Sequence, residues 1–237
     1  MIGRPGLALV FGAAVLAAGP GGAAGQSARL WRPEERVLVS AFHELGAVAT
    51  DLRRVYAASP AGLEIYDFVA RRWEPPSTAE DGYPAGETPT ALAYDRFLDA
   101  LWMGTASGNL YRFRPRSGEW DRVGAVAGGP VLRLVVPRDP REGDVFLATP
   151  AGWARLRRGS LFAEAVPEGG LPAEVRAAGT GPAADRLGRE DPFFEALRGT
   201  LTLDDRLRRW PIADVAPADR PGRFWIATQG GNLLLYD

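Results

Sequence analysis

Residues 101–109 read LWMGTASGN and residues 224–232 read FWIATQGGN, so the two stretches match in register without a gap. Looser copies occupy residues 55–62 (VYAASPAG) and 145–152 (VFLATPAG). All four follow one template of a hydrophobic, an aromatic, a hydrophobic and a small residue, then Ser or Thr, two turn residues and Gly. Self-similarity of this kind is typical of repeat architectures, so the template decides the fold.

The spacing of the template predicts one further copy. An aromatic residue lies six positions before the repeat glycine, and the same spacing recurs at Phe193 and Gly199. This copy is degenerate, because Pro192 and Glu195 replace the branched and the small residue. It is supported by the next segment, where an arginine pair and Trp210 follow as they do in the first unit. The repeat glycines are therefore Gly62, Gly108, Gly152, Gly199 and Gly231.

Each copy predicts a small antiparallel sheet. The run before the glycine alternates apolar and small residues as a strand, and the glycine closes a tight hairpin in which a positive φ carries no Cβ penalty. A second strand follows, and a third ends in an aromatic residue, at Trp73, Trp120, Phe162 and Trp210. Another apolar run precedes each hairpin, as at residues 90–94, 131–136 and 212–216. Four short strands in about 40 to 45 residues are typical of a β-propeller blade.

The sequence thus predicts an all-β fold, a β-propeller of about five four-stranded blades over residues 36–237 with a degenerate fourth blade. The repeat aromatics are expected to pack between blades, where Ala58, Gly104, Ala148 and Ala227 allow close approach. The last unit ends after its third strand, so residues 36–42 are predicted to supply its outer strand and close the ring. A fragment of a larger ring, or a ring completed by another chain, remains the alternative.

One spacing disagrees with five complete blades. Almost no linker separates Trp210 from the next inner strand near Ile212. Crossing a four-stranded blade covers about 14 Å, which takes four to five extended residues. The fourth blade is therefore expected to be incomplete, or its outer strand to end before Trp210.

The two best copies, at residues 101–110 and 224–233, resemble the two-component regulator propeller repeat, whose usual pattern is Leu-Trp-Ile-Gly-Thr, a turn and Gly-Leu. The resemblance is good in these units, fair at 55–67 and 145–156, and poor at 192–204. It implies a β-propeller. Such repeats mostly occur in extracytoplasmic sensor regions ahead of a membrane helix and a kinase.

Composition excludes several kinds of function. Across 237 residues, 28 basic and 29 acidic side chains give a net charge of -1, which provides no field to hold a nucleic acid. The chain has no cysteine and one histidine, so thiol nucleophiles, zinc fingers, iron–sulfur clusters and multi-histidine metal sites are excluded. That histidine, His43, is expected at a strand end or on the surface. Asp67, Asp95 and Asp139 are expected to be solvated turn residues.

Residues 1–25 are predicted to be an export signal. Arg4 supplies a positive n-region, residues 7–18 an apolar h-region, and residues 23–25 small side chains for cleavage. The h-region is too short to span a bilayer, so no transmembrane segment is expected after cleavage. A buried helix and an uncleaved anchor are the alternatives. The mature chain is expected in the periplasm or outside the cell, with residues 26–35 as an extension.

The least repeat-like part of the chain is residues 167–198. Gly and Pro signals indicate loops, and residues 191–197 are consistent with a capped short helix. Loops that interrupt a repeat often carry binding. We therefore predict a partner-binding surface there, carried by Phe194, Glu195 and Arg189. A degenerate blade with a solvated excursion and a catalytic loop are the other interpretations.

No grouping of side chains in the sequence assembles a reactive site, so no catalytic, cofactor or metal residue is predicted. The favoured function is a noncatalytic, exported β-propeller that binds a protein partner or scaffolds an extracytoplasmic, membrane-associated complex. A sensor of small molecules or glycans at the channel mouth is the alternative, favoured by the family resemblance. A propeller lyase or quinone-dependent enzyme is the third class, and such enzymes typically need more histidines or a polar metal cage.

Overall fold

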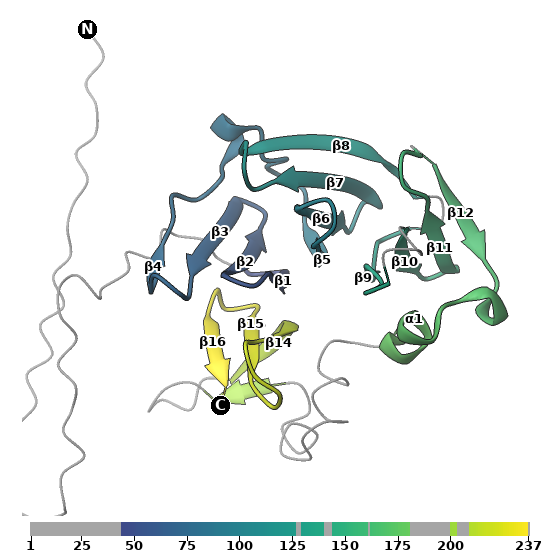
Figure 1. The fold of residues 1–237 in the computed structure, drawn as a ribbon. Coiled ribbons are helices and arrows are strands. Elements are labelled where there is room, and N and C mark those ends of the chain that lie inside the picture. Colours follow the sequence, from purple (N-terminus) through teal and green to yellow (C-terminus); the bar gives the residue numbers. More distant parts are fainter. Residues whose placement is uncertain are drawn as a thin grey trace, which may run out of the picture. The chain divides into compact units, whose positions relative to one another are not determined.

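The computed structural model describes residues 44–126, 129–139, 144–160, 162–180, 200–202 and 209–236. These residues form four small antiparallel sheets arranged as a four-bladed β-propeller (Figure 1). The predicted all-β propeller is confirmed. The predicted number of about five blades is wrong, because the strands of the described residues form four sheets.

In each sheet, the strands neighbour one another in chain order. The first sheet contains β1 (Ala47–Thr50), β2 (Arg54–Ser59), β3 (Gly62–Asp67) and β4 (Arg72–Trp73). The second contains β5 (Pro89–Asp95), β6 (Ala100–Thr105), β7 (Asn109–Arg114) and β8 (Glu119–Ala125). The third contains β9 (Arg133–Val135), β10 (Val145–Thr149), β11 (Gly152–Leu156) and β12 (Ala163–Val166). Short helices are η2 (Ala79–Asp81), η3 (Glu168–Gly170) and α1 (Ala173–Ala178).

The fourth sheet explains the miscount of blades. It contains β13 (Thr200–Thr202), β14 (Arg209–Pro217), β15 (Phe224–Thr228) and β16 (Leu233–Tyr236). The start of β14 pairs with β13, with Trp210 opposite Leu201, and its later part pairs with β15. Trp210 and Ile212 thus lie in one strand, so no crossing linker is needed between them, and β13 joins the last unit in one sheet. Residues 36–42, predicted to close the ring, lie outside the described residues.

The inner strands β1, β5, β9 and β14 run in the same direction. Between β1 and β14, the Val48 N–H donates to Asp214 Oδ2 at 2.9 Å, and Thr50 Oγ1 donates to the Pro217 carbonyl at 2.8 Å. Between β5 and β9, Thr90 bonds the Val131 carbonyl near the start, and Arg96 bonds the Arg138 carbonyl past the end. One end of the propeller therefore carries the loops that leave the inner strands.

We call this end the exit rim. Antiparallel pairing brings the β3–β4 and β11–β12 connections to the same end, as the hydrogen bonds from Phe68 N–H to Arg53 and from Arg158 N–H to Asp144 show. The exit rim consists of the loops 51–53, 68–71, 96–99, 115–118, 157–160 and 218–223, together with Phe162.

The four repeat aromatics among the described residues are buried, as predicted, and Phe193 lies outside the described residues. Tyr56 lies in a cluster that joins the first and second sheets, Trp102 in one that joins the second and third, and Trp225 in one that joins the fourth and first. Phe146 differs, because it packs against Leu171 and Val175 of the α1 region. Among the described residues, no hydrophobic cluster spans the third and fourth sheets.

The template's other positions also have physical roles. A Cβ on Gly104 would lie 2.4 Å from Val131 Cγ1, so this position tolerates no side chain. The Ser/Thr hydroxyl caps its own hairpin; Thr149 Oγ1, for example, donates to the Gly152 carbonyl at 3.0 Å. Gly108, Gly152 and Gly231 have positive φ, whereas Gly62 does not. The need for a positive φ therefore explains the glycine in three of the four described hairpins.

Two expectations about the outer strands and loops need correction. Phe162, expected to pack between blades, is 78% exposed because it precedes β12 in the β11–β12 turn. Trp210 does not end an outer strand; it lies near the start of β14, a continuous strand that pairs with both β13 and β15. The long connection between β4 and β5 is packed: Tyr83 is buried and its ring contacts Trp120 edge-on at 5.0 Å.

Candidate functional site

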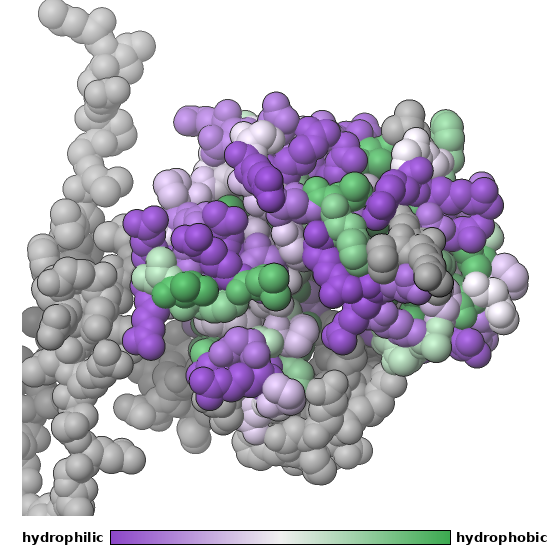
Figure 2. Space-filling model, viewed as in Figure 1, coloured by the Kyte–Doolittle hydropathy of each residue, from purple (hydrophilic) through white to green (hydrophobic). Residues whose placement is uncertain are grey.

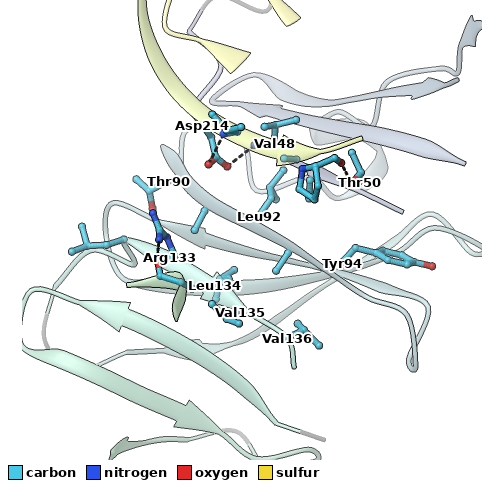
Figure 3. A pocket seen from close by; sticks show the side chains of 18 of the residues that line it. Val48, Thr50, Thr90, Leu92, Tyr94, Arg133, Leu134, Val135, Val136 and Asp214 are labelled. Atoms are coloured by element: carbon cyan, nitrogen blue, oxygen red, sulfur yellow. Dashed lines mark hydrogen bonds between the residues drawn. The ribbon is translucent and has the colours of Figure 1, made fainter. Parts of the chain in front are cut away.

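A central cavity of about 960 Å³ lies among the four inner strands and is bordered by α1 (Figure 3). Aliphatic residues from each of these strands supply much of its lining, including Val48, Leu92, Leu134 and Val215. Its size falls within the range of small-molecule pockets.

Two charged side chains of the cavity lining are buried, Asp214 and Arg133. The Asp214 carboxylate accepts from the Val48 N–H at 2.9 Å and from the Val215 N–H at 2.8 Å. Arg133 Nη1 donates to the Gly179 carbonyl at 3.0 Å, next to the end of α1. Both groups therefore hold backbone segments together, and Figure 3 shows Asp214 beside Val48 at this joint.

The described part of the chain contains no group of three or more His, Cys, Asp or Glu residues placed to hold a metal ion. Within the cavity, Glu174 of α1 accepts from the Arg138 backbone N–H at 3.0 Å and faces the Arg138 guanidinium at 3.6 Å. The cavity thus offers an aliphatic wall with a few engaged polar groups, which can enclose a ligand but presents no nucleophile with a neighbouring base.

The exit rim carries most of the exposed large hydrophobic side chains of the described residues. Five of seven lie in its loops, with exposed fractions of 95% for Leu52, 67% for Val69, 78% for Phe162, 37% for Phe97 and 38% for Leu98. The other two are Leu132 and Leu235. Figure 2 shows apolar side chains gathered in small groups over the first and second sheets, between hydrophilic ones.

Arginines stand beside these apolar residues. The Arg96 guanidinium lies over the Phe97 ring, 4.8 Å from its centroid. Arg53, Arg116 and Arg220 are ion-paired at the rim or beside it, yet their side chains remain more than half exposed. Arg and aromatic side chains are enriched where proteins bind one another.

The rim aspartates are turn residues, as predicted, but two of them are not solvated. Asp67 and Asp95 are buried, and each accepts two backbone N–H bonds from its own turn. The Ala70 N–H, and after it the Arg53 guanidinium, hold the pKa of Asp67 below its usual value. Asp139 is exposed, as expected. The sequence pattern identifies the turn in which each aspartate lies, whereas the burial of its side chain depends on whether a neighbouring loop covers it.

Glu64 of β3 is a buried carboxyl group for which the described contacts include no hydrogen bond or ion pair. It lies opposite Ala57, and opposite residues share a face of the sheet. Ala57 packs in the cluster that joins the first and fourth sheets. Desolvation at this joint raises the pKa of Glu64 from 4.5 to about 7.

We therefore expect the protein to lose stability as the pH rises through this range. The folded state keeps the Glu64 proton to about pH 7, whereas the unfolded chain releases it near 4.5, so the free energy of unfolding falls between these values and stays low above them. Allowing for partial solvent screening, the loss is about 1 to 2 kcal/mol between about pH 5 and pH 8. Urea unfolding at both pH values measures it.

Glu64→Gln is the matched variant, because it keeps the shape and removes the titration. Its stability should change much less over the same pH range. An equal loss in Glu64→Gln would assign the effect to another group, such as His43, the single histidine.

The predicted partner-binding residues Phe194, Glu195 and Arg189 lie outside the described residues, as does His43. The structure does place a helix, α1, earlier in the irregular segment. Sequence reasoning missed the exit rim, although Leu52 carries a signal: it is a lone aliphatic residue between Asp51 and Arg53 in a turn.

No family model matches the chain, and no curated protein matches it. Among solved structures, it is similar to a structure described as the extracellular domain of the hybrid two component system BT4673 from B. thetaiotaomicron. That match has 15% identity and a TM-score of 0.40, and covers 81% of this chain and 21% of the other.

A second similar structure is PorZ of Porphyromonas gingivalis, described as a surface component of the type-IX secretion system, with 16% identity, a TM-score of 0.42, and coverage of 82% and 21%. A third is the computationally designed Ika4 protein, with 11% identity, a TM-score of 0.41, and coverage of 84% and 94%. The chain thus spans about a fifth of each of the two bacterial proteins. It has a β-propeller repeat fold resembling bacterial extracellular domains, and none of these likenesses bears on what it binds.

Within the described residues, no helix has both the length and the apolar character needed to cross a membrane.

Proposed function

We propose that this protein is an exported, noncatalytic β-propeller subunit that binds a protein partner through its exit rim. The observation that supports the proposal is the gathering of Leu52, Val69, Phe97, Leu98 and Phe162 in loops of one end. Exposed apolar side chains scattered singly need no explanation, but a concentration on one face is typical of an interaction surface.

The chemistry of the rim specifies the partner. Its apolar residues alternate with exposed arginines such as Arg53, Arg116 and Arg220. A complementary surface therefore presents apolar side chains flanked by carboxylates, because arginine pairs with carboxylates in a bidentate manner and like charges repel. Export to the periplasm or beyond is part of the proposal and depends on the signal in residues 1–25.

The double variant Leu52→Ser/Phe162→Ser tests the rim. Both side chains are largely exposed, and surface substitutions change stability by about 0.5 kcal/mol or less each, so the melting temperature should stay within about 3 °C of the wild type. A photo-crosslinking residue at position 69, in cells that export the protein, should form a defined adduct in the wild-type background. The double variant should lose most of this adduct.

Leu132→Ser is the control, since Leu132 is 42% exposed but directly precedes β9, at the end of the propeller opposite the exit rim. It should keep the adduct. If the double variant crosslinks as efficiently as the control, the rim is not the docking surface and the proposal is wrong.

A ligand-binding role for the central cavity is the second candidate function. Its volume of about 960 Å³ and its aliphatic lining favour a small, largely apolar molecule. A substitution that fills the cavity, Ala93→Phe, would abolish such binding while leaving crosslinking at the rim unchanged.

A further inference from the structure

A second cavity, of about 530 Å³, lies between the second and third sheets, outside the central cavity. We call it the intersheet groove. Its lining comes from β6, β7 and β8 on one side and from the β11–β12 turn on the other. Leu98, Val123, Val145 and Leu156 make part of it apolar.

Two N–H groups on side chains of the groove have no hydrogen-bond partner. Trp102 Nε1 and Arg112 Nε are each inaccessible to solvent, and neither makes a hydrogen bond in the described contacts. Trp102 is 4% exposed. Buried donors are nearly always paired, and an unpaired one costs about 1 to 3 kcal/mol, so two in one cavity need an explanation.

These two donors are neighbours. Trp102 of β6 and Arg112 of β7 are directly opposite in the strand register, and the Arg112 guanidinium carbon lies 5.8 Å from the centroid of the Trp102 ring. Opposite residues of an antiparallel pair have Cβ atoms about 4.5 to 5.5 Å apart. Both side chains therefore lie on one face of the sheet. Because their N–H groups are closed to solvent, a ligand group meets them only when the Arg112 side chain, which is 29% exposed, moves off the Trp102 ring.

Among the residues that line the groove, basic side chains outnumber acidic ones. Five arginines line it, against the two carboxylates of Asp95 and Asp121; the arginines are Arg112, Arg114, Arg122, Arg157 and Arg158. Asp121 is shared by Arg112 at 2.9 Å and Arg114 at 2.6 Å, and Asp95 accepts from the N–H groups of its own turn. Arg114 and Arg157 also pair with Glu119 and Glu164, and Arg122 donates to Asn109 Oδ1 at 2.7 Å. The described contacts give no ion pair to Arg158, and its side chain is exposed.

We propose that the intersheet groove is a carboxylate-binding site. Trp102 Nε1–H and Arg112 Nε–H donate to the carboxylate oxygens, and Arg158 supplies the opposing charge. The apolar wall of Leu98, Val123 and Leu156 suits the carbon skeleton that carries a carboxylate better than a fully hydrated inorganic ion. Of the five apolar residues on which the proposed function rests, only Leu98 also lines this groove. The carboxylate site and the rim docking surface can therefore be disproved independently of each other.

The indole N–H signals of the folded protein report on the site directly. The chain has seven tryptophans, and Trp102→Phe identifies the Trp102 signal by its disappearance from a proton–nitrogen correlation spectrum. Titration with citrate, or with a hexaglutamate peptide, should move this signal downfield in a saturable manner. Binding of citrate indicates a site for free polycarboxylates, whereas binding of the peptide alone indicates the acidic side chains of a protein.

Variants of the wall separate binding from folding. Arg158→Gln should raise the Kd for the bound probe at least tenfold, since hydrogen bonds to charged groups are the strong ones. Trp102→Phe, with affinity measured by calorimetry, should raise it about three- to tenfold, since one neutral donor is lost. The controls are Arg72→Gln, an exposed arginine on β4, and Trp225→Phe, the equivalent repeat position in the fourth sheet; neither should change the Kd.

Three results would overturn the proposal. The first is no shift of the Trp102 signal with either probe at millimolar concentration, as expected if water alone satisfies the donors. The others are an unchanged Kd in Arg158→Gln, and tighter binding of inorganic phosphate than of citrate and the peptide.

Discussion

Replacing Trp102 with alanine is expected to lower the free energy of unfolding by about 3 to 5 kcal/mol, the range for truncating a packed tryptophan. Trp102 is 4% exposed and lies in the cluster that joins the second and third sheets, with Leu134, Val145 and Leu156 on the far side. Truncation leaves a void between two sheets that share no backbone hydrogen bonds in their ladders. Domains are typically stable by about 5 to 15 kcal/mol, so the loss is a large part of the total.

Urea unfolding followed by circular dichroism measures this loss. Trp102→Phe is the matched control, because it keeps most of the ring and removes the N–H; it should cost clearly less than alanine. A loss below about 1 kcal/mol in Trp102→Ala would show that Trp102 does not hold the two sheets together.

The second large effect is expected at Asp214, where alanine should cost about 2 to 4 kcal/mol. The carboxylate accepts from the N–H groups of Val48 and Val215, and both residues are buried, so truncation leaves two buried donors unpaired. The bond to Val48 also ties the inner strand of the fourth sheet to that of the first. Urea unfolding gives the value, and limited proteolysis should find new cleavage near β1.

Asp219→Ala is the comparison for this variant. Asp219 is a nearby rim aspartate that pairs with Arg223 at 3.1 Å, with 40% of its side chain exposed, and such exposed pairs contribute little. Asp214→Asn should fall between the two, because an amide oxygen can still accept one bond. If Asp214→Ala is no less stable than Asp219→Ala, the fourth and first sheets are held together by their hydrophobic contacts alone.

Much of the fold could be predicted from the sequence, because the template records local requirements. Each requirement fixes one residue type at one position of the template. The template needs a buried aromatic residue between sheets, a small residue such as Gly104 beside Val131, and a hydroxyl that caps the hairpin. Counting the template gave one unit too many for the described residues. The Phe193–Gly199 copy repeats only part of the pattern, and the continuity of β14 is a matter of tertiary pairing that spacing does not reveal.

The candidate sites were harder to predict, because each depends on residues far apart in the chain. The groove combines Trp102 with Arg158, and the central cavity combines four inner strands. A missing hydrogen bond, as at Trp102 Nε1, leaves no trace in a sequence. Phe162 fits the pattern of a packed aromatic yet lies in the open, because the template does not distinguish a strand end from the turn beside it.

The joint between the fourth and first sheets sets the order in which the molecule can assemble. The first three sheets follow one another along the chain and share clusters with their neighbours, so each can dock soon after it forms. The bond from Val48 to Asp214 instead links residues 166 positions apart, and closing so long a loop is slow. A chain that has not closed exposes the apolar faces around Ala57 and Trp225. The amount of aggregate formed during refolding should therefore increase when docking of the fourth sheet on the first is slowed. A chaperone added in excess until this docking is complete should raise the yield of native protein.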